Sequence, residues 1–318
     1  MTDNEPLVRA QDLSRYYGKH CAVRNLNFEL RKGEVLGLLG PNGAGKTSTM
    51  QMLTGNLAPS AGEIRIGGFD LLDEPQRAKR LLGYLPELPP LYPDLTVDEY
   101  LDYCAALHRL PTTQRRPARQ TAKERCGLKD DGRRLIGNLS KGYQQRVGIA
   151  QAIIHSPAVV ILDEPTVGLD PIQIREIRSL IADLGREHGV ILSTHILPEV
   201  QSVCSRVQII HRGRLVFNDS LAGLGARLGA ASLILVCGAQ PDPTALQAVP
   251  GVQAVESLGA GRLRLRYAPG QDPAEAVAAE VVRRGWGLKE LSPEQKSLEQ
   301  IFVELTTSDE TLPAEQAA

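Results

Sequence analysis

The stretch GPNGAGKT at residues 40–47 decides the fold, because it fits the phosphate-binding pattern G-x-x-x-x-G-K-[ST]. An apolar run, Val35–Leu39, leads into it, and a predicted helix, Ser48–Leu53, follows, which gives the strand–loop–helix context that the pattern requires. In such a loop the backbone N–H groups and the positive end of the helix dipole face a nucleotide's phosphates. The sequence predicts a phosphate-binding loop made of Gly40, Pro41, Asn42, Gly43, Ala44, Gly45, Lys46, Thr47 and Ser48.

Two side chains of this loop have a chemical role. The ammonium of Lys46 is placed to reach the β- and γ-phosphates, and the hydroxyl of Thr47 is placed to ligate Mg²⁺. The alternative interpretation is a glycine-rich turn before a helix, and the strand and helix on either side argue against it.

The composition bounds the other properties of the chain. Its 318 residues are enough for one large domain or for two. A formal net charge of −1 and an aromatic content of 4% argue against nucleic-acid binding through bulk charge or base stacking. No apolar run approaches the roughly 18 residues of a membrane helix, and the N-terminal MTDNEPLVRA has no signal-peptide core. Five scattered cysteines without C-x-x-C pairing predict reduced thiols in a cytosolic protein rather than a zinc site.

A second dense stretch of motifs covers residues 135–164. Ser140 is a candidate N-cap for an apolar-faced helix that ends before Pro157. The run Val159–Leu162 is typical of a fully buried strand, and Asp163 and Glu164 follow it. Because open α/β sheets place their ligand chemistry at the carboxyl ends of strands, these two carboxylates are expected at the site.

Another buried strand, Gly189–Thr194, ends at His195. Behind a phosphate loop, the three polar groups have separate predicted roles. Asp163 would hold Mg²⁺ through its water shell, and Glu164 would orient and deprotonate the attacking water. His195 would hydrogen-bond the γ-phosphate and that water. Taken alone, each residue has an ordinary structural interpretation.

Several local patterns predict the surrounding elements. Leu7–Leu13 reads as a strand broken at residues 16–18, and Gln76–Leu82 reads as a short helix. Thr96, with a glutamate three residues later, begins a helix that runs to about Leu110. The basic, proline-broken segment at residues 111–134 is interpreted as a solvated helical surface, with an anion or lipid-headgroup patch as the alternative.

The composition changes after about Leu224, where we place a domain boundary. Residues 225–306 then show a β-α-β-β-α-β pattern, the split βαβ arrangement, closed by a helix over Ser297–Leu305. The polar residues 307–318 are predicted to be disordered.

With these motifs, residues 5–220 resemble the nucleotide-binding subunit of ABC transporters. Tyr17 stands where the family has an adenine-stacking aromatic, and Leu139–Tyr143 (LSKGY) stands at its LSGGQ signature. Gly168–Asp170 matches the D-loop, and His195 matches the switch histidine. The resemblance implies an α/β P-loop NTPase fold of ABC type over residues 1–224, with a mixed sheet, flanking helices and a helical subdomain at about 88–157. A small α+β C-terminal domain follows.

The same resemblance implies an ATPase that uses ATP and Mg²⁺ and works as a homodimer with two ATP molecules between its copies. By the family's rule, Ser140 and the N–H of Gly142 of one copy would then contact the γ-phosphate of the ATP bound to the other, and Lys141 and Asp170 are also expected to bind nucleotide. A separate membrane permease would be the second partner, which places the chain in the cytoplasm on the inner face of the cell membrane. No nucleic-acid partner is expected.

Three departures from the family pattern stand out. Lys141 replaces the first signature glycine, Tyr143 replaces the signature glutamine, and Glu87 stands in place of the Q-loop glutamine. A carboxylate at position 87 keeps an oxygen ligand for Mg²⁺ but adds negative charge. The proline-rich stretch after Tyr84–Glu87 (YLPE) and the tail are similar to type-2 exporters, which include gliding-motility and multidrug ATPases.

Two alternatives remain open from the sequence. The first is a soluble ABC ATPase that acts on nucleic acid or ribosomes. The second concerns the tail domain, which is interpreted as a packing or dimer-stabilising domain, with a small-molecule sensor as the alternative.

Overall fold

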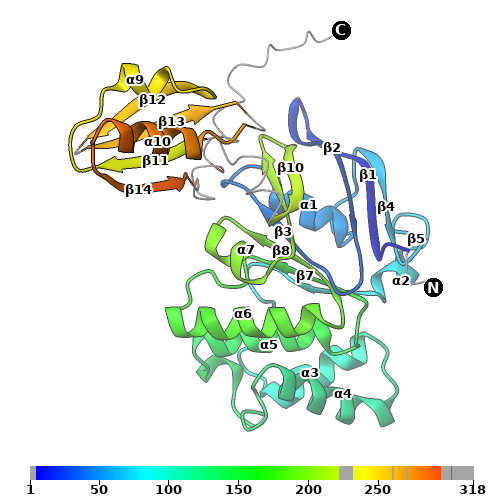
Figure 1. The fold of residues 1–318 in the computed structure, drawn as a ribbon. Coiled ribbons are helices and arrows are strands. Elements are labelled where there is room, and N and C mark those ends of the chain that lie inside the picture. Colours follow the sequence, from blue (N-terminus) through cyan, green and yellow to red (C-terminus); the bar gives the residue numbers. More distant parts are fainter. Residues whose placement is uncertain (1–4, 222–231, 260, 269–270, 295–301, 303–318) are drawn as a thin grey trace. The chain divides into compact units, whose positions relative to one another are not determined.

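The computed structural model describes residues 5–221, 232–259, 261–268, 271–294 and 302. The chain divides into two compact units, Met1–Leu221 and Ala222–Ala318 (Figure 1). The change in composition places the boundary after about Leu224, a few residues beyond this division. None of the helices in the described ranges combines the length and apolarity of a membrane span.

A six-stranded sheet with the order β10-β9-β3-β8-β7-β6 organises the first unit. The strands from β9 to β6 run parallel, and β10 is antiparallel to β9, so the sheet is mixed as predicted. Every residue of β3, β7 and β8 is buried, as expected for continuous apolar runs in a parallel sheet. The bounds are β3 Val35–Leu39, β6 Leu82–Leu85, β7 Val159–Asp163, β8 Gly189–Thr194, β9 Arg206–His211 and β10 Arg214–Ser220.

An antiparallel sheet with the order β2-β1-β4-β5 packs beside it. Its strands are β1 Val8–Tyr17, β2 His20–Leu30, β4 Ala61–Ile66 and β5 Phe69–Asp70. Side chains from both sheets and from α1 (Lys46–Leu53) form one hydrophobic cluster, in which Met50, Met52 and Leu53 are fully buried. The phosphate-loop helix is thus anchored by apolar contacts at its far end.

Strand β1 continues past Leu13 to Tyr17, so the break predicted at residues 16–18 falls at the end of this strand, where the chain turns into β2. Tyr16 and Tyr17 therefore lie near the tip of the β1–β2 hairpin. The predicted helix Gln76–Leu82 is shorter, since α2 spans Pro75–Lys79 and Leu82 begins β6.

Two helices cover the face of the parallel sheet that lies away from the antiparallel sheet and α1. These are α6 (Pro171–Gly185) and α7 (Leu197–Val203), which contact each other, and α7 also contacts β3 and β8. The sequence predicts α6 but not α7. Gly37 in β3 has no side chain where α7 packs, and a Cβ atom there would be 2.9 Å from Cys204 Sγ and 3.0 Å from Val200 Cγ1. This close approach fixes the height of α7 above the sheet.

Three helices, α3 (Val97–Leu107), α4 (Thr112–Arg125) and α5 (Lys141–Ile153), form the helical part of the first unit, with a short 3₁₀ turn, η1, at Ile136–Asn138 (Figure 1). The capping box that begins α3 is present, because Thr96 Oγ1 accepts from Glu99 N at 3.3 Å and Glu99 Oε2 accepts from Thr96 N at 2.8 Å. Helix α3 ends at Leu107, three residues before the predicted end.

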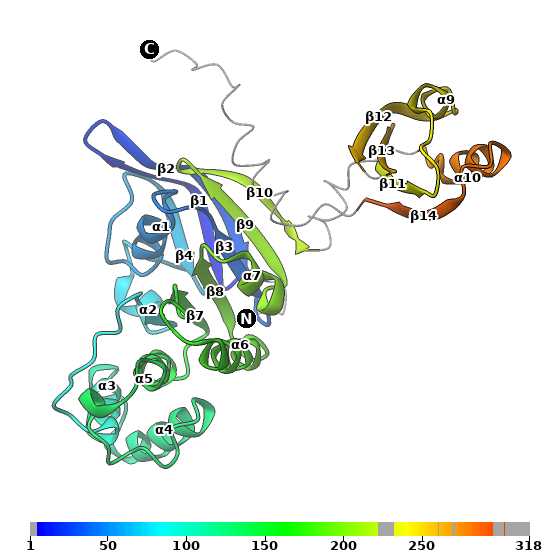
Figure 2. The same cartoon turned by 90° about the vertical axis from the view of Figure 1, so that its left-hand side faces the viewer.

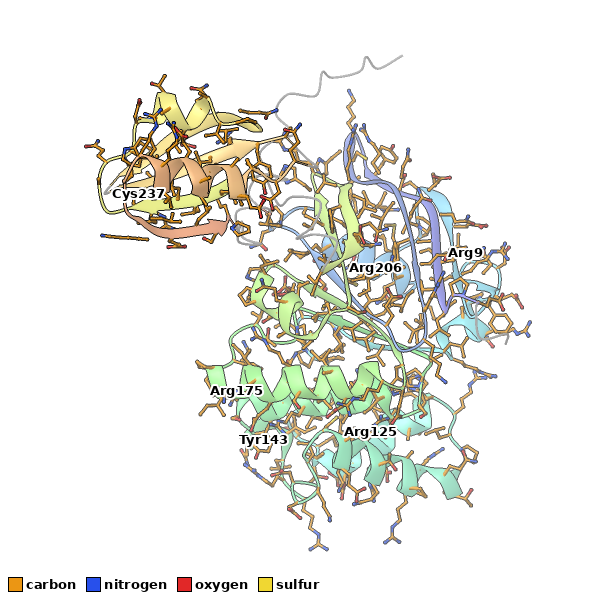
Figure 3. All side chains as sticks on the ribbon, viewed as in Figure 1. Arg9, Arg125, Tyr143, Arg175, Arg206 and Cys237 are labelled. Carbon is orange, nitrogen blue, oxygen red and sulfur yellow. The ribbon has the colours of Figure 1, made fainter. Side chains whose placement is uncertain are left out.

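The basic segment is more structured than the sequence predicts. Helix α4 passes through Pro117 rather than breaking there. Its cations are largely paired, since Lys123 is only 5% exposed and lies 2.6 Å from Asp98, and Arg119 lies 2.8 Å from Asp102. Arg125, labelled in Figure 3, lies 2.7 Å from Glu187. The prediction of a solvated surface is therefore wrong for these cations, and they are also not free to bind an anion.

The second unit follows the predicted order β-α-β-β-α-β (Figure 2). Its antiparallel sheet has the order β12-β13-β11-β14, and its core joins the sheet to Leu246 of α9 and to Val277 and Val281 of α10. The bounds are β11 Ser232–Cys237, α9 Pro243–Gln247, β12 Val252–Gly259, β13 Arg262–Tyr267, α10 Ala274–Arg283 and β14 Leu288–Pro293. Apart from Phe302, the predicted helix Ser297–Leu305 and the tail 307–318 lie outside the described residues.

Candidate functional site

The phosphate loop connects the end of β3 to the start of α1. Gly45 is the N-cap of α1 with a φ of 107°, and a side chain on it would collide with the carbonyl oxygen of Ala22. Gly43 also has a left-handed φ of 78°, which glycine adopts without strain. As N-cap, Gly45 provides no side-chain hydrogen bond to α1, and the first turn of α1 contains no acidic residue that would repel an anion. The N–H groups at this end of the helix can therefore bind an anion.

Lys46 is held inside this loop. Its Nζ donates to the carbonyl oxygens of Gly40 at 2.8 Å and Pro41 at 3.3 Å, and it lies 3.7 Å from Glu164 Oε1. Only 6% of the residue is exposed. Burial lowers the pKa of the Lys46 ammonium, while the charge of Glu164 opposes that shift. The ammonium is thus partly desolvated and directed at the place where phosphates would bind.

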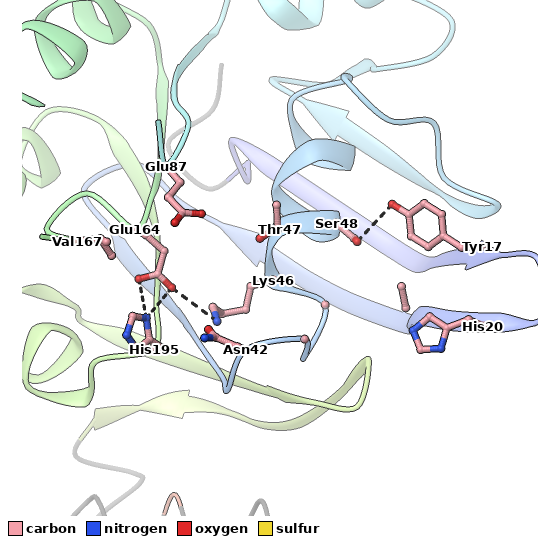
Figure 4. Close-up of a pocket in the computed structure, with 13 residues that line it drawn as sticks. Tyr17, His20, Asn42, Lys46, Thr47, Ser48, Glu87, Glu164, Val167 and His195 are labelled. Atoms are coloured by element: carbon pink, nitrogen blue, oxygen red, sulfur yellow. Dashed lines mark hydrogen bonds and ion pairs between the residues drawn. The ribbon is translucent and has the colours of Figure 1, made fainter. Parts of the chain in front are cut away.

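A cavity of about 490 Å³ lies over the loop, and Figure 4 shows the side chains that face it. This volume is within the range of small-molecule sites. The predicted lining residues are Tyr17, Asn42, Gly43, Gly45, Lys46, Thr47, Ser48, Glu87, Glu164 and His195. The sequence missed His20, Ala22 and Val167, which also line it. The first two come from the β1–β2 hairpin, whose position over the loop depends on sheet packing that no local pattern encodes.

Tyr17 lies at one end of the cavity, on that hairpin. Its hydroxyl is 3.4 Å from Ser48 Oγ, and the guanidinium of Arg15 lies 4.8 Å from the centre of its ring. Tyr17 is 45% exposed. An exposed ring with one cation over it offers a stacking surface to a planar base.

Glu164 and His195 face each other at the other end of the cavity (Figure 4). His195 Nδ1 lies 3.0 Å from Glu164 Oε1 and 2.9 Å from Oε2. They meet because β7 and β8 are adjacent parallel strands, with Asp163 opposite Ser193. Glu164 has a left-handed φ of 47°, and its N–H donates to the carbonyl of Ser193 at 3.0 Å. The sequence predicts this pair of loops, but it gives no sign of the unusual backbone at Glu164.

The oxygen groups predicted to hold a metal ion fit Mg²⁺. Asp163 is 2% exposed, and its Oδ1 is buried without a hydrogen-bond partner in the described part of the chain. Burial raises the pKa of the Asp163 carboxyl. Thr47 and Glu87 line the neighbouring cavity. Among the residues that the structure describes, no cluster of three His, Cys, Asp or Glu side chains is arranged to hold a metal.

The residues predicted to contact a partner's nucleotide lie elsewhere, and we call Ser140, Lys141, Gly142 and Asp170 the signature surface. Ser140 caps α5 by accepting from Tyr143 N at 3.5 Å, and Asp170 caps α6 by accepting from Ile172 N and Gln173 N, both at 2.9 Å. The Lys141 side chain lies against Gly168, and Gly142 lies against the side chain of Gln173. None of the four lines the cavity over the phosphate loop.

Comparison with known proteins agrees with this geometry. A family model described as "ABC transporter" matches residues 23–167. The linearmycin resistance ATP-binding protein LnrL of Bacillus subtilis (strain 168) is 31% identical over 306 residues, covering 94% of this chain and 98% of that protein. The bacitracin transport ATP-binding protein BcrA of Bacillus licheniformis is 38% identical, covering 66% of this chain and 68% of that protein.

A solved structure, described as the ATP-binding subunit of an ABC transporter, superposes with a TM-score of 0.64 at 31% identity. The match covers 70% of this chain and 93% of that one. The fold class predicted for the first unit is confirmed by this likeness.

Proposed function

Because the chain belongs to the ABC transporter ATP-binding proteins, we propose that it hydrolyses ATP at the cavity over the phosphate loop and thereby drives a separate membrane permease. The observation that carries the catalytic assignment is the position of Glu164 between two partners. Its Oε2 lies 2.9 Å from His195 Nδ1, and its Oε1 lies 3.7 Å from the buried Lys46 ammonium. A base, a hydrogen-bonding imidazole and a phosphate-binding cation thus converge on one end of the cavity. None of the relatives described above is named for action on nucleic acid or ribosomes.

In this proposal ATP lies along the cavity. The N–H groups of residues 43–48 bind its β- and γ-phosphates, together with the Lys46 ammonium. The adenine stacks on the exposed ring of Tyr17. Lys46 would exchange its contacts with the carbonyls of the loop for phosphate oxygens, which are stronger acceptors because they are charged.

Mg²⁺ would be held by the hydroxyl of Thr47 and by Asp163 through water, with Glu87 beside it. Once bound, it would supply positive charge that neutralises the phosphates. The buried, unpartnered Oδ1 of Asp163 supports this assignment.

Glu164 would accept the proton of the attacking water. In the structure both of its carboxylate oxygens contact His195 Nδ1. A γ-phosphate near His195 would offer that imidazole another hydrogen-bond partner and free a Glu164 oxygen for the water. The left-handed backbone at Glu164 directs the side chain from the end of β7 toward the phosphate loop.

The signature surface supports the dimer proposal. Ser140, Lys141 and Asp170 are exposed at the N-terminal ends of α5 and α6 and face no nucleotide of their own chain. A helix N-terminus attracts phosphate. We infer that this surface closes over the ATP bound to a second copy, as the family resemblance implies.

Exposed apolar side chains follow the Q-loop position in the chain and support a permease partner. Leu88 is 81% exposed, Tyr92 50%, Tyr103 42% and Leu107 63%. Such side chains after Glu87 suit contact with a cytoplasmic segment of a membrane protein. The names of the relatives, which refer to linearmycin resistance and bacitracin transport, favour export over import. The chain would then act at the inner face of the cell membrane.

The test is a Glu164→Gln variant of the full chain. Without a carboxylate to accept the proton, we expect ATP turnover to fall about a hundredfold or more, while the affinity for Mg²⁺-ATP stays within about threefold of the unmodified chain. Turnover is measured by phosphate release and affinity by calorimetry. Glu187→Gln, at a carboxylate whose side chain is 65% exposed, is the matched control and should hydrolyse normally. Near-normal hydrolysis by Glu164→Gln would remove Glu164 as the base.

A further inference from the structure

Behind the cavity, one buried carboxylate joins the two loops that carry Glu164 and His195. Glu199, in the first turn of α7, is only 1% exposed. One of its oxygens accepts a hydrogen bond from the Thr166 hydroxyl, and the other accepts from Thr194 Oγ1 at 2.7 Å. Burying a carboxylate is unfavourable unless hydrogen bonds compensate it. An apolar side chain would fill this place at lower cost, which points to a role other than packing.

Glu199 reaches both loops because α7 lies close to the sheet. Gly37 leaves room for Val200 and Cys204 of the α7 segment, as described above. Helix α7 also contacts α6 and β8. Its first turn therefore lies at the carboxyl ends of β7 and β8, within hydrogen-bonding distance of Thr166 and Thr194. Neither Glu199 nor its two threonine partners line the cavity.

The hydrogen bonds of Glu199 act close to the reacting groups. Thr166 follows Glu164 by two residues, in a turn where Val167 N donates to the Glu164 carbonyl at 3.2 Å. Thr194 directly precedes His195, and its hydroxyl also accepts from Ile196 N at 3.1 Å. The backbone on both sides of His195 is thereby tied to Glu199.

Together with the contact between the Glu164 and His195 side chains, which we call the front contact, these bonds close a ring. It runs from Glu164 through Thr166 to Glu199, then through Thr194 to His195, and His195 Nδ1 returns to the Glu164 carboxylate at 2.9 Å. The two loops are therefore joined twice, once by the side chains that face the cavity and once by Glu199 behind it.

We propose that Glu199 is a positioning residue for hydrolysis, which keeps the Glu164 loop and the His195 loop at a fixed spacing. The inference rests on the proposed function, in which Glu164 turns to the water and His195 turns to the γ-phosphate. That step opens the front contact. The rear bonds through Glu199 involve neither reacting side chain, so they persist while the front contact is exchanged. A shift of about 1 Å between catalytic groups can cost roughly a hundredfold in rate.

The test uses the full chain with Glu199→Ala, Glu199→Gln, Thr166→Val and Thr194→Val. We expect Glu199→Ala to lower kcat about tenfold or more, with the dissociation constant for Mg²⁺-ATP within about twofold, because the loop and Lys46 do not contact Glu199. Glu199→Gln should retain most of the turnover, since an amide can accept from one threonine and donate to the other. Each threonine variant should fall between these two.

Two controls separate positioning from a general structural role. Thr54→Val removes another buried hydroxyl, which donates to Met50 O at 3.0 Å away from the cavity, and should leave kcat within about twofold. In a His195→Ala background, Glu199→Ala should add little further loss, since the spacing it maintains no longer serves a function.

The outcomes are distinguishable from those of the main proposal. A kcat within about twofold of normal for Glu199→Ala, or an undiminished loss in the His195→Ala background, would overturn the positioning role even if Glu164→Gln is inactive. Full turnover by Glu164→Gln would instead overturn the assigned base. If Glu199→Ala does not fold, Thr166→Val and Thr194→Val decide the question by the same two readouts.

Discussion

The polar groups at the cavity and those on the signature surface differ in burial and in hydrogen bonding. Lys46 lines the cavity and Asp163 lies buried beside it, and burial shifts the pKa of each toward its neutral form. On the signature surface, Asp170 is exposed and accepts two backbone hydrogen bonds at 2.9 Å, which stabilise the start of α6. Burying the charges of Lys46 and Asp163 thus lowers the stability of the folded chain, and bound Mg²⁺-ATP would compensate for it. The polar groups of the signature surface stabilise the fold without a ligand.

The variant expected to have the largest effect on this contrast is Asp163→Asn. Removing a carboxylate that would orient the waters of Mg²⁺ should lower metal-dependent turnover by roughly 10- to 100-fold. The same change should raise the free energy of unfolding of the nucleotide-free chain by about 1 kcal/mol at neutral pH, because a poorly compensated buried charge is lost. Phosphate release and thermal unfolding measure the two effects.

The pH dependence of that gain has a definite sign. The folded-state pKa of Asp163 is raised, so the folded chain binds a proton at a pH where the unfolded chain does not. The destabilisation is therefore full above the folded-state pKa and disappears as pH falls through the window down to the ordinary aspartate value. The advantage of Asp163→Asn should shrink over the same window. An advantage that grows on acidification would contradict the assignment.

A smaller effect is expected at the signature surface. Asp170→Ala removes two hydrogen bonds at 2.9 Å and should lower the free energy of unfolding by about 1–2 kcal/mol. Ser140→Ala removes a single one at 3.5 Å and should lower it by only about 0.5 kcal/mol. Denaturant unfolding gives both values. A stabilising effect of either change would remove the contrast with Asp163→Asn.

The sequence can bring several residues of the candidate site together because they stand at strand ends. Asp163 and His195 follow buried apolar runs, and the carboxyl ends of parallel strands meet at one edge of a sheet. The phosphate loop is equally local, since its glycines and lysine lie within eight consecutive positions. The fold class and the order of elements in the second unit follow from the same kind of periodicity.

Other features depend on contacts between distant segments, which no local pattern encodes. Helix α7 is seven residues long and lies close to the sheet because of Gly37, far earlier in the chain. Without α7 placed, Glu199 reads as an ordinary surface glutamate. Lys123 likewise reads as part of a solvated basic face, but Asp98 on a neighbouring helix pairs with it. The left-handed backbone at Glu164 is also set by tertiary structure.

The central claim is that the cavity of one copy and the signature surface of another together enclose ATP. The most direct measurement is the solution mass of the full-length Glu164→Gln variant, by light scattering, with and without Mg²⁺-ATP. Because this variant should bind ATP without hydrolysing it, we expect a rise to twice the monomer mass of 34.5 kDa when ATP is added. A Lys46→Ala, Glu164→Gln double variant should not respond. A mass that is independent of ATP in Glu164→Gln, at saturating nucleotide, would contradict the account.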